Sequence, residues 1–215
     1  MQFEGKCAFV TGAASGMGLK FSESWAAEGG CVLMCDINGD VLREKAEEIG
    51  RKGPGRAEAC LCDVRDYAQI TAARDRAVEA FGSIDLSVSF AGGTAVRVCQ
   101  VDREAYPEFP DVPIEVFDWG IDVNLRAQLY VAHAVMAQMR KQGSGLVVNI
   151  GSVWKRFLRG IRRQCRWHYF LYAGRGILRN GRSFLRSNQL VWVAGYRSNC
   201  YQRCPSDNNV GSDDV

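Results

Sequence analysis

The chain has 215 residues, of which 47% are apolar, and a formal net charge of +3, values that describe one large globular domain. No apolar run reaches the ~18 residues of a transmembrane helix, and the N-terminus lacks the layout of a secretory signal peptide. The nine cysteines are odd in number and scattered, which favours a reducing, cytoplasmic setting over a disulfide framework.

Short apolar runs alternate with amphipathic stretches of helical length from the N-terminus to residue 151. We expect strands at residues 6–11, 31–36, 57–62, 84–90 and 145–150. We expect helices between them at residues 16–29, 40–52, 67–81 and 118–141. Strands that are apolar throughout and separated by helices indicate a parallel sheet covered on both faces. Right-handed crossovers then give an α/β fold with a doubly wound sheet.

The stretch 94–113 interrupts this alternation and carries three of the five prolines, so we expect a loop after the fourth strand. Loops at the carboxyl ends of parallel strands line the ligand crevice of such a sheet. A plain surface excursion is the other interpretation, and the sequence leaves both open.

A glycine-rich turn, Thr-Gly-Ala-Ala-Ser-Gly-Met-Gly at residues 11–18, joins the first expected strand to the first helix. Glycines allow a tight turn, and the helix N-terminus offers free N–H groups to a pyrophosphate. Asp36 ends the next strand, 18 residues beyond Gly18. A carboxylate there accepts hydrogen bonds from ribose hydroxyls and repels a 2′-phosphate, which predicts NAD rather than NADP. Alone, the turn could be a simple connection and Asp36 a solvated strand-end charge.

Further motifs follow in chain order, and together the sequence resembles the short-chain dehydrogenase/reductase family. The turn at residues 11–18 matches the family pattern Thr-Gly-x-x-x-Gly-x-Gly. Asp63 and Val64 correspond to its Asp-Val pair, and Ser-Phe-Ala-Gly at 89–92 stands where the family usually has Asn-Asn-Ala-Gly. Asn124 corresponds to the helix asparagine and Ser152 to the catalytic serine. Each residue also has an ordinary structural interpretation, as a turn cap or a helix hydrogen bond.

The resemblance implies a Rossmann domain over residues 1–153 and hydride transfer between NAD(H) and a small alcohol or carbonyl compound. Ser152 and Asn124 are the implied catalytic residues, and no metal is expected. The implied cofactor-binding residues follow the strands: Gly12, Ser15, Gly16, Met17, Gly18, Asp36, Ile37, Asp63, Val64, Phe90, Ala91 and Gly92.

The family's proton donor is absent from this sequence. Family members use a tyrosine about a dozen residues after the serine, with a lysine four residues later that lowers the tyrosine pKa. Here that place falls at Cys165, and none of the seven tyrosines is followed by lysine at that spacing. The last lysine, Lys155, precedes every tyrosine that follows the serine. We therefore expect hydride transfer to be impaired, and the alternative is a catalytically inactive NAD-binding protein.

Residues 154–215 form an atypical segment rich in arginine and aromatic residues. Residues 1–153 carry 15 basic and 21 acidic residues, whereas residues 154–215 carry 12 basic and 3 acidic ones, and eleven of those twelve are arginine. A frame disruption near Val153 is the interpretation we favour, because the regular alternation of elements ends there.

Two alternatives remain for this segment. It could belong to a divergent family member that keeps cofactor binding, or form a basic–aromatic module for nucleic acid or a membrane surface. No recognisable motif supports the second, so neither partner is expected. We expect a possible strand at residues 190–194 and a disordered tail at 205–215. Family members usually form homo-oligomers through the Asn124 helix and the next one, which this sequence does not show.

Overall fold

A computed structural model describes residues 1–93, 109–151, 168–172 and 190–197. Its strands are β1 (Cys7–Thr11), β2 (Cys31–Asp36), β3 (Arg56–Leu61), β4 (Leu86–Ser89), β5 (Ser144–Gly151), β6 (His168–Tyr172) and β7 (Leu190–Arg197). Its helices are α1 (Gly16–Ala27), α2 (Gly39–Lys52), α3 (Tyr67–Phe81), α4 (Ile114–Ile121) and α5 (Ala127–Gln142), with a 3-10 turn, η2 (Phe109–Asp111), and a π-helical turn, η3 (Asp122–Arg126).

The strands form one sheet in the order β3-β2-β1-β4-β5-β7-β6. The first five pair in parallel, which confirms the doubly wound sheet expected from the sequence. β7 pairs antiparallel with β5, and β6 pairs antiparallel with β7. The strand expected at residues 190–194 is therefore present and extends to Arg197. The chain reverses its direction of travel across the sheet between β1 and β4, so the ligand crevice of this fold class belongs at their carboxyl ends.

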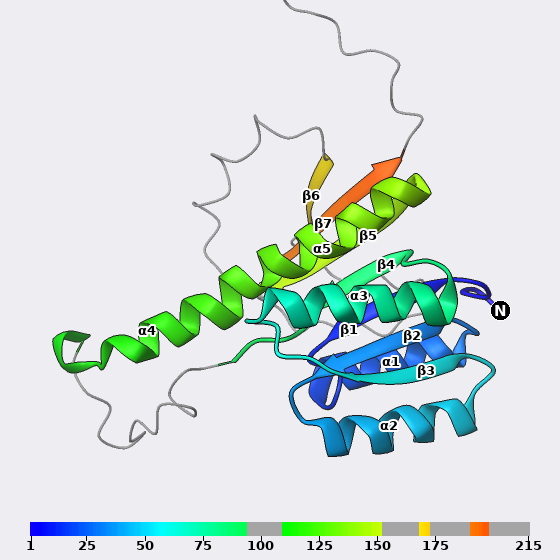
Figure 1. Cartoon of the computed structure of the whole chain (residues 1–215), viewed down its shortest axis with the longest axis horizontal. Coiled ribbons are helices and arrows are strands. Elements are labelled where there is room, and N and C mark those ends of the chain that lie inside the picture. The colour runs from blue at the N-terminus through cyan, green and yellow to red at the C-terminus, as the bar shows by residue number, and fades with distance from the viewer. Residues whose placement is uncertain (94–108, 152–167, 173–189, 198–215) are drawn as a thin grey trace, which may run out of the picture.

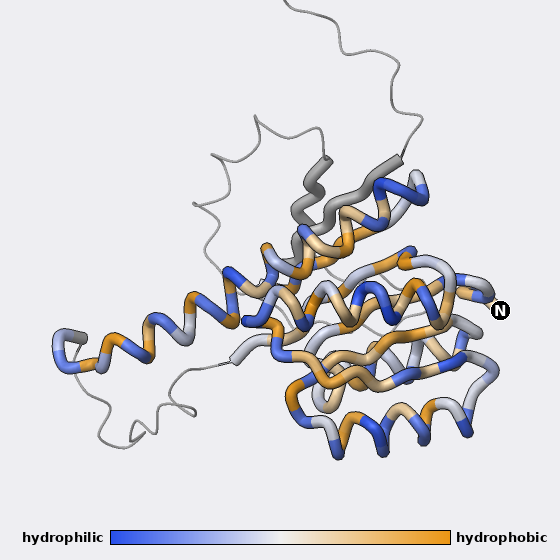
Figure 2. Tube along the Cα trace, in the orientation of Figure 1, coloured by the Kyte–Doolittle hydropathy of each residue, from blue (hydrophilic) through white to orange (hydrophobic). Residues whose placement is uncertain are grey.

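Helices cover both faces of the sheet (Figure 1), and the strands between them are largely hydrophobic (Figure 2). One hydrophobic core lies on each face. Successive side chains of a strand point to opposite faces, so β1 contributes to both cores and all five of its residues are buried. Phe9 faces α3 and α5, where Ile70 and Val131 pack in the same cluster. Val10 faces α1 and α2, where it packs with Trp25 and Leu42.

The helical rod from α4 to α5 departs from the expected single helix at residues 118–141. It begins at Ile114, directly after Pro113, and the π-helical turn η3 interrupts it. The expected boundary was wrong because a proline preceding a helix fits its first turn as well as it fits a loop. Along this rod four large apolar side chains are exposed: Ile114, Ile121, Leu125 and Leu129. No helix in the described part of the chain is long and apolar enough to cross a membrane.

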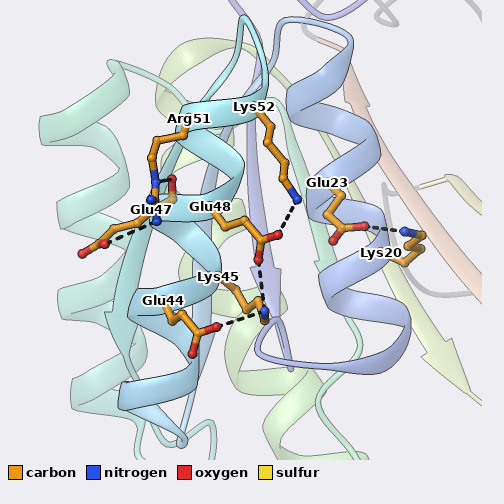
Figure 3. Close-up of polar contacts among 8 residues, drawn as sticks. All are labelled: Lys20, Glu23, Glu44, Lys45, Glu47, Glu48, Arg51 and Lys52. Atoms are coloured by element: carbon orange, nitrogen blue, oxygen red, sulfur yellow. Dashed lines mark hydrogen bonds and ion pairs between the residues drawn. The ribbon is translucent and has the colours of Figure 1, made fainter.

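The outer surface of α2 carries a row of ion pairs (Figure 3). Lys45 contacts Glu44 and Glu48, and Lys52 also contacts Glu48. Hydrogen bonds from the two lysines lower the pKa of Glu48 to about 2. Exposed pairs of this kind contribute little to stability, so this helix is held mainly by its buried apolar face.

Candidate nucleotide-binding site

The turns that follow β1 and β4 contact each other at the carboxyl ends of these two neighbouring strands, between which the chain reverses its direction across the sheet. The Phe90 N–H donates to the Thr11 carbonyl at 3.1 Å, and the Ala91 N–H to the Thr11 hydroxyl at 3.3 Å. Gly12 has a φ of +67°, and a Cβ there would lie 2.7 Å from the Ala91 nitrogen. Glycine is therefore required at position 12 by the backbone of Ala91, whether or not a nucleotide is bound.

The N-terminus of α1 lies in open surroundings beside this contact. Ser15, Gly16 and Met17 are exposed. Gly16 has a φ of +57°, and among the described residues no atom lies within 4 Å of the place its Cβ would take. A Cβ on Gly18 would lie 2.2 Å from the Gly12 carbonyl oxygen, so α1 begins closely packed on the turn. An exposed helix N-terminus with room in front of it suits a phosphate group.

Asp36 is held at the end of β2 by the backbone of the glycine-rich turn. One of its carboxylate oxygens accepts the Ala14 N–H at 3.0 Å, and the other accepts the Asn38 N–H at 3.0 Å. The carboxylate is half-buried, and the next side chain, Ile37, is 69% exposed. The structure therefore brings Asp36 and the turn together, as a nucleotide site of the expected kind requires.

Asp63 and Val64 follow β3 and differ in their surroundings. The Arg65 guanidinium binds the Asp63 carboxylate, with Nε at 3.0 Å from both oxygens, and lowers the pKa of that carboxyl group. The Cys62 N–H donates to the Asp36 carbonyl at 3.0 Å, which places this turn beside the end of β2. The Val64 side chain is buried in the core, so only its backbone could reach a nucleotide.

Asn124 lies in the π-helical turn and fastens the chain after β4 to it. Its Oδ1 accepts the Gly93 N–H at 2.9 Å, and its Nδ2 donates to the carbonyls of Gly93 and Gly120, both at 3.0 Å. A Cβ on Gly92 would lie 2.9 Å from the same Oδ1. π-helical turns frequently mark functional sites. Ser152, the other expected catalytic residue, lies outside the described residues.

Three further polar residues lie near the carboxyl ends of β4 and β5, and the sequence did not predict them as site residues. Gln128 donates to the Ile150 carbonyl at 2.9 Å and so ties α5 to the end of β5. Ser89 and Asn149 are register partners on β4 and β5. Each has a buried side-chain oxygen without a hydrogen-bond partner among the described residues. Such atoms usually bind water or a ligand group. The burial of these oxygens would have identified the two residues, but burial depends on strand register and cannot be read from the sequence.

Replacement of Asn124 by alanine is expected to lower the free energy of unfolding by about 1–3 kcal/mol, because three side-chain hydrogen bonds are lost. Urea unfolding followed by circular dichroism measures the change. Gln138→Ala is the matched control, since that amide on the same rod makes one side-chain bond, to Gln142 at 3.3 Å. An equal loss in both variants would contradict the fastening role of Asn124.

The parallel sheet with helices on both faces defines a Rossmann-like α/β domain. The sequence profile of the family described as short chain dehydrogenase matches residues 6–159. The chain belongs to this family of oxidoreductases.

Individual relatives agree with this assignment over the same region. The 7alpha-hydroxysteroid dehydrogenase of Escherichia coli K12 is 30% identical over 153 residues, which are 71% of this chain and 55% of that protein. The 2-dehydro-3-deoxy-L-rhamnonate dehydrogenase (NAD(+)) of a Sphingomonas strain is 34% identical over 152 residues, with the same coverage. The chain therefore spans about half the length of the curated relatives it matches.

Solved structures resemble the same part of the fold. A 7 alpha-hydroxysteroid dehydrogenase in complex with NADH and 7-oxo glycochenodeoxycholic acid has a TM-score of 0.60 and 30% identity, over 70% of this chain and 54% of that one. An NAD+-bound xylitol dehydrogenase has a TM-score of 0.61 and 28% identity, over 69% and 54% of the two chains. An NADPH-dependent 3-quinuclidinone reductase from Rhodotorula rubra has a TM-score of 0.60 and 25% identity, over 67% and 51%. The relatives thus include users of both nicotinamide cofactors.

Proposed function

We propose that residues 1–153 bind NAD(H) and that hydride transfer to or from a small alcohol or carbonyl compound is impaired in this chain. The observation that carries the proposal is the position of Asp36. Its carboxylate is hydrogen-bonded to the backbone of the glycine-rich turn, in front of the exposed N-terminus of α1. A pyrophosphate and the adjoining adenosine ribose need these two features side by side.

The described residues fit such a cofactor. The open space at Gly16 leaves room for a phosphate, and the backbone N–H groups at the start of α1 are its donors. Asp36 would accept hydrogen bonds from the adenosine ribose and repel a 2′-phosphate. Ile37, exposed beside it, offers an apolar surface for the adenine. Asp63, which already binds Arg65, is assigned to the adenine edge.

A bound nicotinamide supplies hydride transfer, and the chain's own residues would position the reacting partner and move the proton. Asn124 holds Gly93, which keeps the segment after β4 beside the π-helical turn. Ser152 is assigned to the reacting oxygen as a hydrogen-bond donor. The chain contains no Tyr-x-x-x-Lys sequence to deliver the proton, which is why we propose impaired turnover.

The preference for NAD(H) can be tested at Asp36. We expect the full chain to bind NADH at least about tenfold more tightly than NADPH, a difference of about 1.4 kcal/mol. Asp36→Ala should bring the two dissociation constants within about threefold of each other, because the like-charge repulsion of the 2′-phosphate is removed. Titration calorimetry with both nucleotides measures the ratio.

Asp40→Ala is the matched control for this ratio. Asp40 is an exposed carboxylate four residues further on, paired with Arg43 on α2 and outside the proposed site. Its removal should leave the ratio unchanged. Equal affinity of the unmodified chain for both nucleotides would contradict the assignment of Asp36, and so would an equal shift in the Asp40 variant.

The setting of the activity follows from the same proposal. We infer a small-molecule substrate and a cytoplasmic location, because the cytoplasm contains NAD(H) and keeps thiols reduced. Family members usually associate through the Asn124 helix and the next one, and we propose no such association for this chain because its sequence does not show the second helix.

A further inference from the structure

Three cysteines meet on one face of the sheet, beside the proposed nucleotide site. Cys35 on β2 and Cys60 on β3 are register partners in a parallel pair. Cys62 comes two residues after Cys60, so it lies on the same face. Neighbouring strands lie about 4.8 Å apart, a spacing within the range of Cα separations that a disulfide bridges. The register therefore places Cys35 and Cys60 within reach of a covalent link.

The three thiols differ in their access to solvent. Cys35 and Cys62 are buried in the core under α3 and α5, with 0% and 1% exposure. Cys60 is only half-buried, because β3 is the outermost strand of the sheet. One accessible thiol thus has two sheltered thiols beside it on the same face of the sheet.

A cationic side chain lies over the same strand. Arg76 of α3 forms an ion pair at 3.5 Å with Glu58, which is two residues before Cys60 on the same face of β3. The neighbouring Cys35 thiol lowers the pKa of the Cys60 thiol; burial and the Glu58 carboxylate oppose this shift, and the Arg76 charge assists it. Its two neighbouring thiols and its burial raise the pKa of Cys35. The accessible thiol of the pair is therefore also the one that ionises more readily.

We propose that Cys60 and Cys35 form a peroxide-sensitive thiol pair, in which Cys60 is the reactive thiol and Cys35 closes a disulfide between β2 and β3. The Cys60 thiolate attacks one oxygen of a hydroperoxide, an S–O bond forms, and the O–O bond breaks. The leaving hydroxide or alkoxide takes up a proton. The Cys35 sulfur then attacks the sulfenic acid, the S–S bond forms, and the S–O bond breaks with loss of water. The two thiols lose two electrons and the peroxide gains them.

Cys35 rather than Cys62 is the expected partner of Cys60. Residues two apart on an extended strand are separated by about 6.6 Å, near the upper limit for a disulfide. The Cys35 carbonyl also accepts the Ala13 N–H at 3.1 Å, so the proposed link adjoins the glycine-rich turn. The test below nevertheless needs no nucleotide, so its result does not depend on the proposed function.

Peptide mapping of the intact chain tests the link. The folded protein is treated with stoichiometric hydrogen peroxide, its remaining thiols are alkylated at low pH, and it is digested with trypsin without reduction. Cleavage after arginine and lysine gives peptide 57–65, with Cys60 and Cys62, and peptide 21–43, with Cys31 and Cys35. We expect these two peptides to be joined, with fragmentation placing the bond between Cys35 and Cys60. A bond from Cys60 to Cys62, or no bond in the oxidised protein, would overturn the proposal.

Variants separate the two roles. Cys60→Ser should abolish the cross-link. Cys31→Ser is the control and should keep it, because Cys31 is a half-buried cysteine on the same strand as Cys35 but is not part of the proposed pair. Cys35→Ser should leave a sulfenic acid at Cys60 that dimedone traps. If this buried substitution prevents folding, the Cys60 and Cys31 variants still decide the question. A cross-link that persists in Cys60→Ser would overturn the assignment.

Alkylation kinetics of the unmodified chain give an independent measure. At pH 7 Cys60 should react with iodoacetamide several times faster than Cys31, a cysteine of the same half-buried class, because the pKa of the Cys60 thiol is lowered. Arg76→Gln should reduce this advantage, since it removes the neighbouring positive charge. Equal rates for Cys60 and Cys31 in the unmodified chain would show that Cys60 is an ordinary thiol and would refute the proposal.

Discussion

Replacement of Gly12 by valine is expected to lower the free energy of unfolding by about 2–6 kcal/mol, much of the total stability of a typical domain. The φ of +67° is strained for a β-branched residue. A Cβ would also lie 2.7 Å from the Ala91 nitrogen and 2.9 Å from its Cα, and backbone atoms cannot move aside as a side-chain end can. The turns after β1 and β4 must therefore separate, which opens the sheet at its centre.

Two glycine controls separate the sources of this loss. At Gly16 the φ is positive but an added Cβ meets no described atom, so Gly16→Ala should lower the free energy of unfolding by only about 1–2 kcal/mol. Gly50→Ala lies within α2 with no described atom within 4 Å of the new Cβ, and should stabilise the chain by up to about 1 kcal/mol. Urea unfolding followed by circular dichroism measures all three. A Gly12→Val chain as stable as Gly16→Ala would contradict the close approach of Ala91.

Turnover of alcohols and ketones by this chain is expected to fall about 10⁴–10⁶-fold below that of a relative with a complete catalytic apparatus. Loss of general acid–base help costs about 10²–10⁴-fold. The family resemblance implies that the missing lysine also holds the nicotinamide ribose, and misplacement of the reacting carbon by about 1 Å costs a further ~10²-fold. The two losses multiply because they act on different parts of the transition state.

The assay is NADH oxidation by purified, folded chain against a broad carbonyl panel, with the Escherichia coli 7alpha-hydroxysteroid dehydrogenase as positive control. NADH affinity is measured on the same sample, so that failure to bind is distinguished from failure to react. Turnover within about tenfold of the control enzyme would contradict the proposed impairment. Tyr169 or Tyr172 would then have to work with a partner other than a lysine four residues later.

The sequence predicted the five parallel strands within the first 151 residues because most of them are apolar runs between turn residues; β3, with Arg56 and Glu58, is the least apolar of them. It also predicted that Asp36 and the glycine-rich turn would lie close together, since they stand at the carboxyl ends of two parallel strands. The reason for glycine at position 12 could not be predicted. The clashing atom belongs to Ala91, and only the pairing of β1 with β4 brings that residue close.

Register and tertiary packing decided the remaining features. The pairing of Cys35 with Cys60 depends on which residues of β2 and β3 stand opposite each other, and scattered cysteines do not reveal it. Phe90, at a position where the family usually has asparagine, packs near Phe21 of α1 with the ring centres 5.8 Å apart. Side-chain partners so distant in the chain leave no periodic signal in the sequence. The fastening of Gly93 by Asn124 is a contact of the same kind.

The central position of β1 also governs the order in which a ribosome completes the sheet. β1 is synthesised first, and its pairs with β2, and of β2 with β3, are available once residue 61 has emerged. Its other edge has no partner until residues 86–89 follow. During that interval five apolar or buried residues present an open strand edge, the feature that makes nascent sheets prone to self-association. Slowed elongation before β4 should therefore increase co-translational aggregation, and chaperone binding at this stage would relieve it.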